Sequence, residues 1–125
     1  MAHLCGLENP PVFCPLVADF YSGMEVTVSI FKNDTKASID GIRAFYRDYY
    51  KNGLVFCNDN EDENGMLSAS LFSGRDDMCI SVHGNDDRMI LTARFDNLGK
   101  GASGAAIQNM NILLGVDEKT GLCVE

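Results

Sequence analysis

The feature that most constrains this chain is a run of glycines that joins an apolar segment to a helical pattern. The apolar segment Met89 to Phe95 leads through Asp96-Asn97-Leu98 into the run Gly99 to Gly104. This run spells G-x-G-x-x-G, which marks a dinucleotide site when it closes a strand, opens a helix and precedes an acidic residue about 20 positions later. Asp117 and Glu118 stand near that distance.

The surroundings of the motif argue against a complete dinucleotide-binding unit. Such a unit needs a second strand after the helix, with the acidic residue at the end of that strand. Asp117 and Glu118 instead follow Gly115 in a segment without a strand pattern. Two explanations of the small residues remain open. Either the helix start packs closely on a sheet, or its free N–H groups form a site for an anion or a polar ligand.

Length, charge and cysteine content bound the remaining possibilities. The chain has 125 residues, and we expect one domain over residues 1–125 with a core of its own. The net charge of −8 argues against binding to nucleic acid or anionic membranes, and no apolar run approaches the roughly 18 residues of a membrane span. The five cysteines contain no C-x-x-C pair, which favours free thiols in a cytoplasmic protein over disulfides or a zinc site.

Apolar periodicity and turn residues predict both strands and helices. We expect strands at Val12–Ala18, Met24–Phe31 and Leu54–Cys57, a hairpin of Met78–His83 with Arg88–Phe95, and helices at Ser38–Lys51 and Ala102–Leu114. Prolines argue against a helix in residues 1–15, and Met66–Phe72 is ambiguous, with extended backbone as one interpretation. Ser38 is expected to cap the first helix, and Asn52-Gly53 to end it. Gly115 is expected to end the last helix.

Several other groups have a plain structural interpretation. An apolar stripe on the first helix is expected to lie in the core; its members are Ile39, Ile42, either Phe45 or Tyr46, and Tyr49. Arg75 and Arg94 are expected in structural salt bridges, although either guanidinium suits a carboxylate or phosphate. His83 stands at the end of the hairpin without a ligand partner in the sequence, and Cys14 is expected to be a small buried residue.

An acidic segment resembles the start of a calcium-binding loop. Asn60-x-Asp62-x-Asn64-Gly65 has the spacing of the first ligands of such a loop. However, Leu71 stands where the loop needs a bidentate glutamate, and flanking helix patterns are missing. We therefore expect a solvated surface loop and no metal site.

The residues around the glycine run closely resemble a known signature. Asp96-Asn97-Leu98, Lys100-Gly101-Ala102 and the segment Gly104 to Asn111 are similar to the C-terminal signature of the N-acetyl-gamma-glutamyl-phosphate reductases. These enzymes are arginine-biosynthesis members of the semialdehyde dehydrogenase superfamily. Phe20 to Met24 matches a loop that they place near the active site. The resemblance extends over residues 10–122, and it departs from the family at Ala105, where a glutamine is common.

The resemblance implies a fold and a division between two domains. The fold is α+β, with a mixed, mostly antiparallel sheet and helices packed on one face, and it forms the C-terminal substrate and dimerisation domain of a larger reductase. An N-terminal dinucleotide-binding domain would bind most of NADP, while Asn97, Gly101 and Gly104 would bind its nicotinamide end. The catalytic cysteine and histidine of the family lie before the region that aligns with Met1. No catalytic residue is therefore expected in this chain.

The resemblance also implies a reaction. An NADPH-dependent, homo-oligomeric enzyme of arginine biosynthesis would reduce N-acetyl-glutamyl phosphate to N-acetyl-glutamate semialdehyde and release phosphate. The isolated chain is expected to be inactive, because none of its cysteines stands beside a base or a helix start, where a thiolate is stabilised. An alternative remains open, in which the chain is a non-catalytic module that binds a small ligand or regulates another protein.

Overall fold

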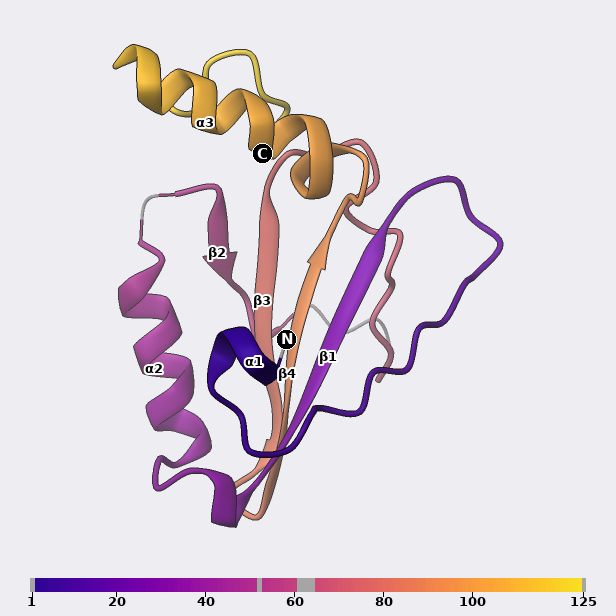
Figure 1. Ribbon diagram of the computed structural model, residues 1–125, viewed down its shortest axis with the longest axis vertical. Helices are drawn as coiled ribbons and strands as arrows, with labels where there is room; N and C mark the ends of the chain where they lie inside the picture. Colours follow the sequence, from indigo (N-terminus) through magenta and orange to yellow (C-terminus); the bar gives the residue numbers. More distant parts are fainter. Residues whose placement is uncertain (1, 52, 61–64, 125) are drawn as a thin grey trace.

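The strands form one mixed sheet at the centre of the molecule (Figure 1). The computed structural model describes residues 2–51, 53–60 and 65–124. Within them, β1 (Met24–Phe31), β4 (Arg88–Phe95), β3 (Met78–Asn85) and β2 (Val55–Cys57) lie side by side in that order. β4 is antiparallel to β1 and to β3, whereas β2 runs parallel to β3. The predicted α+β class with a mixed, mostly antiparallel sheet is confirmed, as are these strands to within two residues.

The register of the strands gives the sheet one apolar face. β1 places Val26 and Val28 opposite Ala93 and Leu91 of β4, and β4 in turn pairs Leu91 with Val82 of β3. These residues alternate along each strand, so that their side chains point to the same side of the sheet. Val82 is buried, but Val26 and Val28 remain 44 % and 50 % exposed. The apolar face is therefore covered over β3 and open over β1.

The opposite face carries mostly polar side chains, and one aromatic ring packs against part of it. Ser81 and Thr92 face each other across β3 and β4, with their hydroxyl oxygens 2.6 Å apart. Arg94 lies on the same face and is fully buried, with its guanidinium carbon 5.6 Å from the centre of the Phe72 ring. The guanidinium carbon of Arg75 lies 4.6 Å from the same ring. Phe72, which is itself fully buried, thus joins a segment of turns to the polar face of the sheet.

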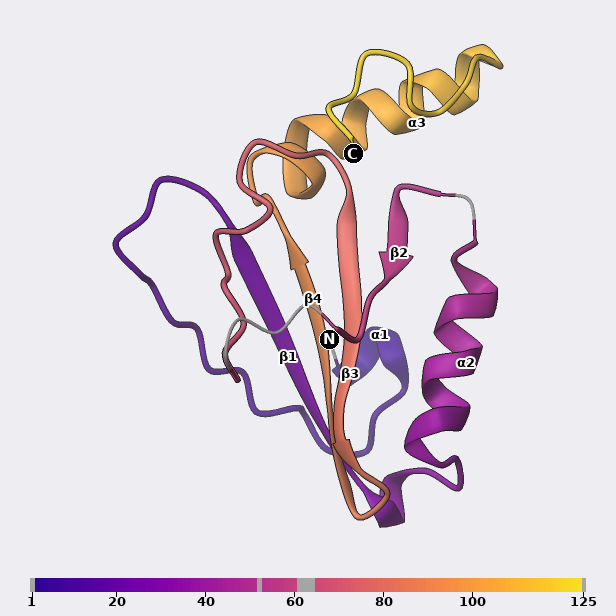
Figure 2. The same ribbon diagram turned by 180° about the vertical axis from the view of Figure 1, so that it is seen from behind.

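The helix α2 (Ile39–Tyr49) packs against β2 and β3 (Figures 1 and 2). It begins as predicted, because the Ser38 hydroxyl accepts a hydrogen bond from the Gly41 N–H at 3.1 Å. The predicted stripe is only partly in the core. Tyr49 is 70 % exposed, so the prediction is wrong for this residue; of the two alternatives, Tyr46 is half-buried whereas Phe45 is 61 % exposed. The rings of Phe45 and Tyr49 stack on each other, and Phe45 lines a hollow that it shares with Ile30 of β1 and Leu91 of β4.

The last helix, α3 (Gly104–Leu114), crosses the end of the sheet rather than lying on a face (Figures 1 and 2). It continues directly from a π-helical turn at Gly99–Ser103, so the helical backbone begins at the first glycine of the motif and earlier than predicted. Gly115 ends the helix as predicted, with a left-handed φ of 68°. None of the helices within the described residues has the length and apolar run that crossing a bilayer requires.

The N-terminal segment departs most from the predictions. Residues 11–18 form no strand, since within the described chain no backbone hydrogen bond pairs them with β1 or any other strand. Cys14 is exposed rather than buried, and Val12 and Val17 are almost fully exposed. A single helical turn, α1 (Ala2–Cys5), precedes the prolines. Residues 69–74 form turns, whereas extended backbone was one interpretation of the sequence there, and Asn52 of the predicted helix stop lies outside the described residues.

The accessible surface of the molecule is larger than that of a compact monomer of the same mass. Its accessible surface is 8822 Å² for 13.7 kDa. A compact monomer of this mass exposes about 6,600 Å². The excess of about 2,200 Å² includes apolar side chains of residues 11–18, β1, α2 and α3. The fold therefore carries surfaces that suit contact with further protein.

Phe72→Ala tests whether this ring organises the polar face. We expect it to lower the free energy of unfolding by about 3–5 kcal/mol, since the ring is fully buried and its removal leaves a cavity beside two guanidinium groups. Phe45→Ala removes the same side chain at an exposed site and should cost less than about 1 kcal/mol. Urea unfolding of both variants measures the difference, and equal costs would show that Phe72 has no special role.

Candidate functional site

The buried carboxylate of Asp96 joins three separate segments of the chain. Its Oδ2 accepts hydrogen bonds from the Ser22 hydroxyl at 2.9 Å and from the Gly74 N–H. Its Oδ1 accepts from the N–H groups of Leu98 at 2.7 Å and Gly99 at 3.2 Å. Asp96 therefore caps the helical turn that follows it and fixes the turn before β1 against the turns before β3.

These hydrogen bonds determine the charge state of Asp96. Burial by itself would raise the pKa of this carboxyl, but hydrogen bonds from Gly74, Leu98, Ser22 and Gly99 outweigh burial and lower the pKa below its ordinary value. The carboxylate is 3 % exposed and has no cation within ion-pair distance among the described residues. Its charge is thus held by N–H and O–H donors, as in a helix cap.

Asn97 lies at the edge of the same network and faces an open hollow. Its side-chain oxygen accepts a hydrogen bond from the Gly23 N–H at 2.9 Å, which leaves the amide nitrogen without a partner among the described residues. The hollow has a volume of about 490 Å³. Residues 16–18 and 20–24, together with Glu25, Thr27, Ala69 and Asn97, line it. The amide nitrogen of Asn97 is therefore free to donate to a ligand.

The helix start does not offer the row of free N–H groups that an anion site needs. Leu98 and Gly99 donate to Asp96 Oδ1, and Gly101 donates to the Asp96 carbonyl oxygen at 2.8 Å. Lys100 donates to the Arg75 carbonyl oxygen at 3.4 Å. Of the two explanations of the glycine run, close packing within the protein is therefore the one that this geometry favours.

Gly101 and Gly104 sit in different surroundings. Gly101 is exposed, and a side chain there would press on the Phe95 ring and the Asp96 carbonyl oxygen. Gly104 is buried, and a side chain there would collide with the carboxylate of Asp76. Asp76 cannot easily move, since its Oδ2 accepts from the Cys123 N–H at 2.9 Å. Gly101 therefore lies where a ligand can reach it, and Gly104 lies inside the packing of the helix.

A chain of side chains runs along the inner side of α3. The ammonium of Lys100 donates to Gln108 at 2.6 Å, and Gln108 donates to Glu118 at 2.8 Å. Burial lowers the pKa of Lys100 more than the charges of Glu118, Asp76 and Asp77 raise it. This chain of hydrogen bonds holds the segment after α3 against the helix.

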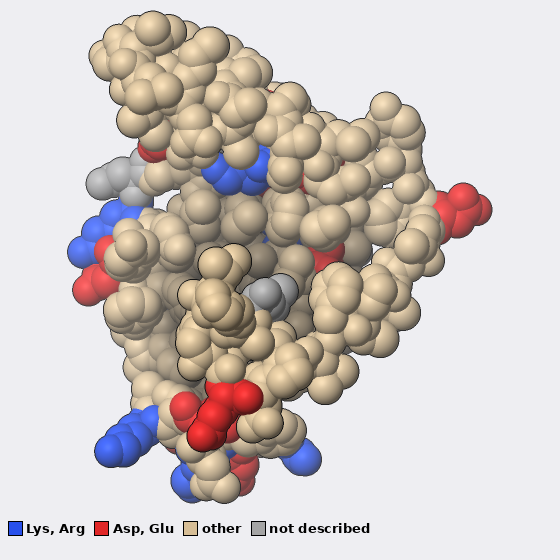
Figure 3. All heavy atoms as spheres, in the orientation of Figure 1, with Lys and Arg blue, Asp and Glu red and all other residues tan. Residues whose placement is uncertain are grey.

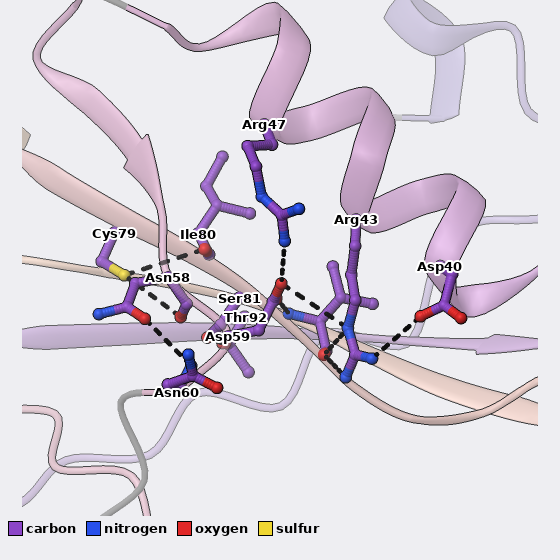
Figure 4. Close-up of polar contacts among 11 residues, drawn as sticks. Asp40, Arg43, Arg47, Asn58, Asp59, Asn60, Cys79, Ile80, Ser81 and Thr92 are labelled. Carbon is purple, nitrogen blue, oxygen red and sulfur yellow. Dashed lines mark hydrogen bonds and ion pairs between the residues drawn. The ribbon is translucent and has the colours of Figure 1, made fainter.

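A second polar cluster joins α2 to β3 (Figure 4). Arg43 donates from Nε and Nη2 to the Val82 carbonyl oxygen at 3.1 and 2.8 Å, and Asp59 accepts from the Val82 N–H at 2.9 Å. Arg47 lies 3.4 Å from Asp59, and both arginines reach toward this carboxylate from the same helix. Because each charge has a partner inside the cluster, its role is to fasten the helix to the sheet.

The remaining candidates have structural partners or lie elsewhere. Arg75 forms a two-pronged ion pair with Asp77 at 2.8 and 2.6 Å, which confirms its expected structural role. Arg94 donates to the Ser68 carbonyl oxygen at 3.4 Å beneath Phe72. His83 is half-buried on β3. Asp62 and Asn64 of the segment similar to a calcium loop lie outside the described residues.

The cysteines show no activated thiol among the described residues. Burial, followed by the charge of Asp59, raises the pKa of the Cys57 thiol, which makes the thiolate scarcer. Cys79 is fully buried between strands. Cys5, Cys14 and Cys123 are exposed, and no hydrogen bond or ion pair joins their sulfur atoms to a base within the described residues. All five are free of disulfides.

The sequence predicts Asn97, Gly101 and Gly104 as site residues, but it does not reveal the residues that fix them in place. Ser22 and Asp96 are 74 positions apart, and Asp76 lies 28 positions before Gly104. The sequence contains one local signal for Asp96, because an aspartate just before a glycine run at a helix start is a typical capping residue. The partner of that aspartate is visible only once the sheet brings the turn before β1 beside the end of β4.

Comparison with known proteins gives relatives for nearly the whole chain, although no protein-family model matches it. The chain is 38 % identical to N-acetyl-gamma-glutamyl-phosphate reductase 2 of Nostoc sp., with 94 % of the chain and 39 % of the relative aligned. It is 37 % identical to N-acetyl-gamma-glutamyl-phosphate reductase of Trichormus variabilis over the same shares. The enzyme of the same name from Brucella suis is 36 % identical over 87 % of the chain and 37 % of the relative. The chain thus spans under two fifths of the length of these curated relatives.

Asp96→Asn tests the central cap. We expect it to lower the free energy of unfolding by about 2–3 kcal/mol at pH 7, because an amide cannot accept all four hydrogen bonds that the carboxylate accepts. Since folding lowers the pKa of Asp96, its stabilisation is complete above the ordinary aspartate pKa of about 3.9. It is lost as the pH falls through the lowered value.

Urea unfolding at pH 7 and pH 3 checks both parts of this prediction. The difference between the two proteins should shrink at the lower pH, while the exposed control Asp19→Asn should match the unsubstituted protein at both. A difference that grows in acid would show that folding raises the pKa of Asp96 instead of lowering it.

Gly104→Ala tests the packing of α3 on Asp76. The added methyl group meets a carboxylate fixed by Cys123, so we expect a loss of about 1–3 kcal/mol in spite of the better helix propensity of alanine. In a chain that already carries Asp76→Ala, the same change should cost about 1 kcal/mol less. Thermal unfolding of the four proteins of this cycle gives the coupling, and additive costs would place Gly104 away from Asp76.

Proposed function

We propose that this chain, which is homologous to one part of the N-acetyl-gamma-glutamyl-phosphate reductases, serves as the C-terminal substrate and dimerisation domain of such an enzyme. The reaction is the reduction of N-acetyl-glutamyl phosphate by NADPH to N-acetyl-glutamate semialdehyde and phosphate, a step of arginine biosynthesis. The enzyme acts in the cytoplasm, which the free thiols of the chain support.

The observation that carries this proposal is the meeting of two distant segments at one site. Phe20 to Met24 and Asp96 to Gly115 are the parts of the chain most similar to the reductases, and they are far apart in the sequence. The structure joins them through Ser22 to Asp96 and through Gly23 to Asn97. A hollow lies beside the joint. If each motif served only its local structure, the fold would not need to bring the two together beside a hollow.

The residues at this joint fit the nicotinamide end of NADP. A nicotinamide carries a carboxamide whose oxygen needs a donor, and the Asn97 amide nitrogen is a donor held in place by the Gly23 N–H. Gly101 is exposed on the helical turn that follows Asn97, and its lack of a side chain makes room for the Phe95 ring and leaves the backbone of that turn uncovered. Gly104 contributes by letting α3 pack on Asp76, which fixes the turn that carries the other two. NADPH, when bound, supplies the hydride of the reaction.

The chain's own contribution is to bind and orient. Its thiols lack an adjacent base, and the raised pKa of Cys57 works against a thiolate. The cysteine that forms a thioester with the substrate, and the histidine that assists it, therefore belong to the part of the enzyme outside these residues. The open apolar side chains of β1, such as Val26 and Val28, suit contact with a second copy in a symmetric homo-oligomer.

A reductase assay tests the proposed function. The reverse reaction, phosphate-dependent reduction of NADP with N-acetyl-glutamate semialdehyde, should be absent with these residues alone. It should appear in a hybrid protein in which the region of the Nostoc relative outside the match precedes this chain. In that hybrid, Asn97→Ala should lower kcat/KM for NADP about 10–100-fold through loss of one hydrogen bond. A matched control, Asn33→Ala, removes an exposed amide far from the joint and should leave kcat/KM unchanged.

Each outcome of the assay is informative. Turnover by the isolated chain that disappears when one cysteine becomes serine would place the catalytic centre inside these residues. A correctly folded hybrid without turnover, combined with tight binding of an acylated amino acid by the isolated chain, would favour a non-catalytic binding module.

A further inference from the structure

The hollow beside Asn97 carries negative charge that no basic side chain offsets. Glu25 of β1 lines it, and a carboxylate oxygen of Glu25 accepts a hydrogen bond from the Thr27 hydroxyl at 3.2 Å. None of the described residues that line the hollow is a lysine, an arginine or a histidine. The ion pairs within the described chain do not include Glu25 either. Its charge is therefore available to a ligand.

A second carboxylate lies directly behind the wall of the hollow. Ser22 belongs to that wall, and its hydroxyl donates to Asp96 Oδ2 at 2.9 Å. The ionised carboxylate of Asp96 has no cation within ion-pair distance among the described residues. One carboxylate in the wall and one behind it give the hollow a negative potential, which favours a positively charged ligand.

The figures show the same imbalance of charge. In Figures 1 and 2 the loop that leads into β1 arcs away from the edge of that strand. Residues 16–18 and 20–22 of this loop line the hollow. Figure 3 shows an acidic side chain and no basic one over the projecting part of the loop, at the right of that view. A cation that approaches from this side meets attraction only.

The rest of the lining suits a flat ring that carries a carboxamide. Phe20 and Met24 are 43 % and 40 % exposed, and Tyr21 is 91 % exposed, so these apolar surfaces are open to a ligand. The faces of aromatic rings attract cations. The Asn97 amide nitrogen can donate to a carbonyl oxygen. The volume of about 490 Å³ lies within the range of small-ligand sites, which is about 300–1,000 Å³.

We propose that Glu25 makes this hollow selective for the positively charged, oxidised form of the nicotinamide ring, an inference that rests on the function proposed above. The ring is neutral in NADPH and positively charged in oxidised NADP, whereas the carboxamide is the same in both. Asn97 binds the group that the two forms share, and Glu25 distinguishes them by charge. A carboxylate about 6 Å from the ring, at an effective dielectric constant of about 40, changes the affinity about tenfold.

This selectivity has consequences for the proposed reaction. Glu25 stabilises the positive charge that develops on the ring during hydride transfer, because its own charge is already in place. The same attraction slows the release of the oxidised cofactor. Glu25 thus acts on the charge of the ring, while Asn97 acts on its orientation.

Two small probes test this selectivity on the chain itself. 1-Methylnicotinamide is a positively charged ring with the carboxamide, and nicotinamide is its neutral counterpart. Ligands of about ten heavy atoms bind with a Kd of about 1–10 mM. NMR titration, followed at the Asn97 side-chain amide and the Gly23 N–H, should show millimolar binding of the cation and about tenfold weaker binding of the neutral ring.

Glu25→Gln keeps an acceptor for the Thr27 hydroxyl but removes the charge. It should weaken binding of the cation about 5–10-fold and leave binding of nicotinamide unchanged. Asn97→Ala should weaken both probes equally, because both carry the carboxamide. The matched control Glu8→Gln removes an exposed carboxylate that does not line the hollow, so it should change neither affinity.

Several results would overturn the proposal. These are equal affinities for the two probes, no binding of either well above the millimolar range, and the same loss from Glu8→Gln as from Glu25→Gln. Tetramethylammonium carries the charge without the ring or the carboxamide. If it binds as tightly as 1-methylnicotinamide, the hollow accepts any cation, and nicotinamide is wrong as its occupant.

The hybrid protein described above separates this inference from the proposed function. Selective binding of the cationic probe by the chain, together with a folded hybrid that has no turnover, would retain the role of Glu25 and reject the reductase. Turnover by a hybrid in which Glu25→Gln leaves the ratio of the Kd values for oxidised NADP and NADPH unchanged would retain the reductase and reject the role of Glu25.

Discussion

The carboxylate of Asp96 is the interaction on which the rest of this structure depends. It is buried, ionised and surrounded by donors from three parts of the chain, including Ser22 and Gly74. A buried carboxylate without such donors would be costly, because burial disfavours its charge. With them, it fixes the direction in which the chain leaves β4 and enters the last helix. Asn97 follows Asp96 directly, so the hydrogen bonds of Asp96 also fix the position of Asn97. The two residues together determine the geometry of the candidate site.

The sheet supplies the platform for this joint through an asymmetry between its faces. On the polar face, Phe72 packs over Arg94, and the hydroxyl groups of Ser81 and Thr92 are buried against each other. The apolar face is closed only where α2 covers β3. Phe72, the fully buried aromatic residue, packs on the polar face, whereas the aliphatic side chains Val26 and Val28 on the other face stay exposed. That pattern is expected for a unit that completes its core against further protein.

The sequence predicts what is determined by neighbours in the chain and misses what depends on distant partners. Ser38 as a cap, Gly115 as a stop and the β3–β4 hairpin follow from local geometry, and the structure confirms them. The strand expected at residues 12–18 has the right side chains, but a strand forms only beside a partner that offers hydrogen bonds. Tyr49 fits a helical stripe in period but not in burial, because the stripe is longer than the part of α2 that packs on the sheet.

The glycine run shows why a motif needs its surroundings before it is given a function. Gly99 lies against the Arg75 carbonyl oxygen and Gly104 against the Asp76 carboxylate, so both are required by contact with the turn before β3. Packing therefore accounts for both glycines without any nucleotide phosphate. The N–H groups that a phosphate would use are already bonded to Asp96 and Arg75.

Gly101 is exposed, but a side chain there would press on the Phe95 ring and on the Asp96 carbonyl oxygen, so packing accounts for this glycine as well. If the spelling of the motif reflected a phosphate loop, all three glycines would line one cradle of free donors. Instead, each of the three lies where a side chain would meet the protein itself. The N–H groups of Leu98 and Gly99 are bonded to Asp96, that of Lys100 is bonded to the Arg75 carbonyl oxygen, and the Lys100 ammonium donates to Gln108, so the turn is built as a packed joint and not as a phosphate cradle.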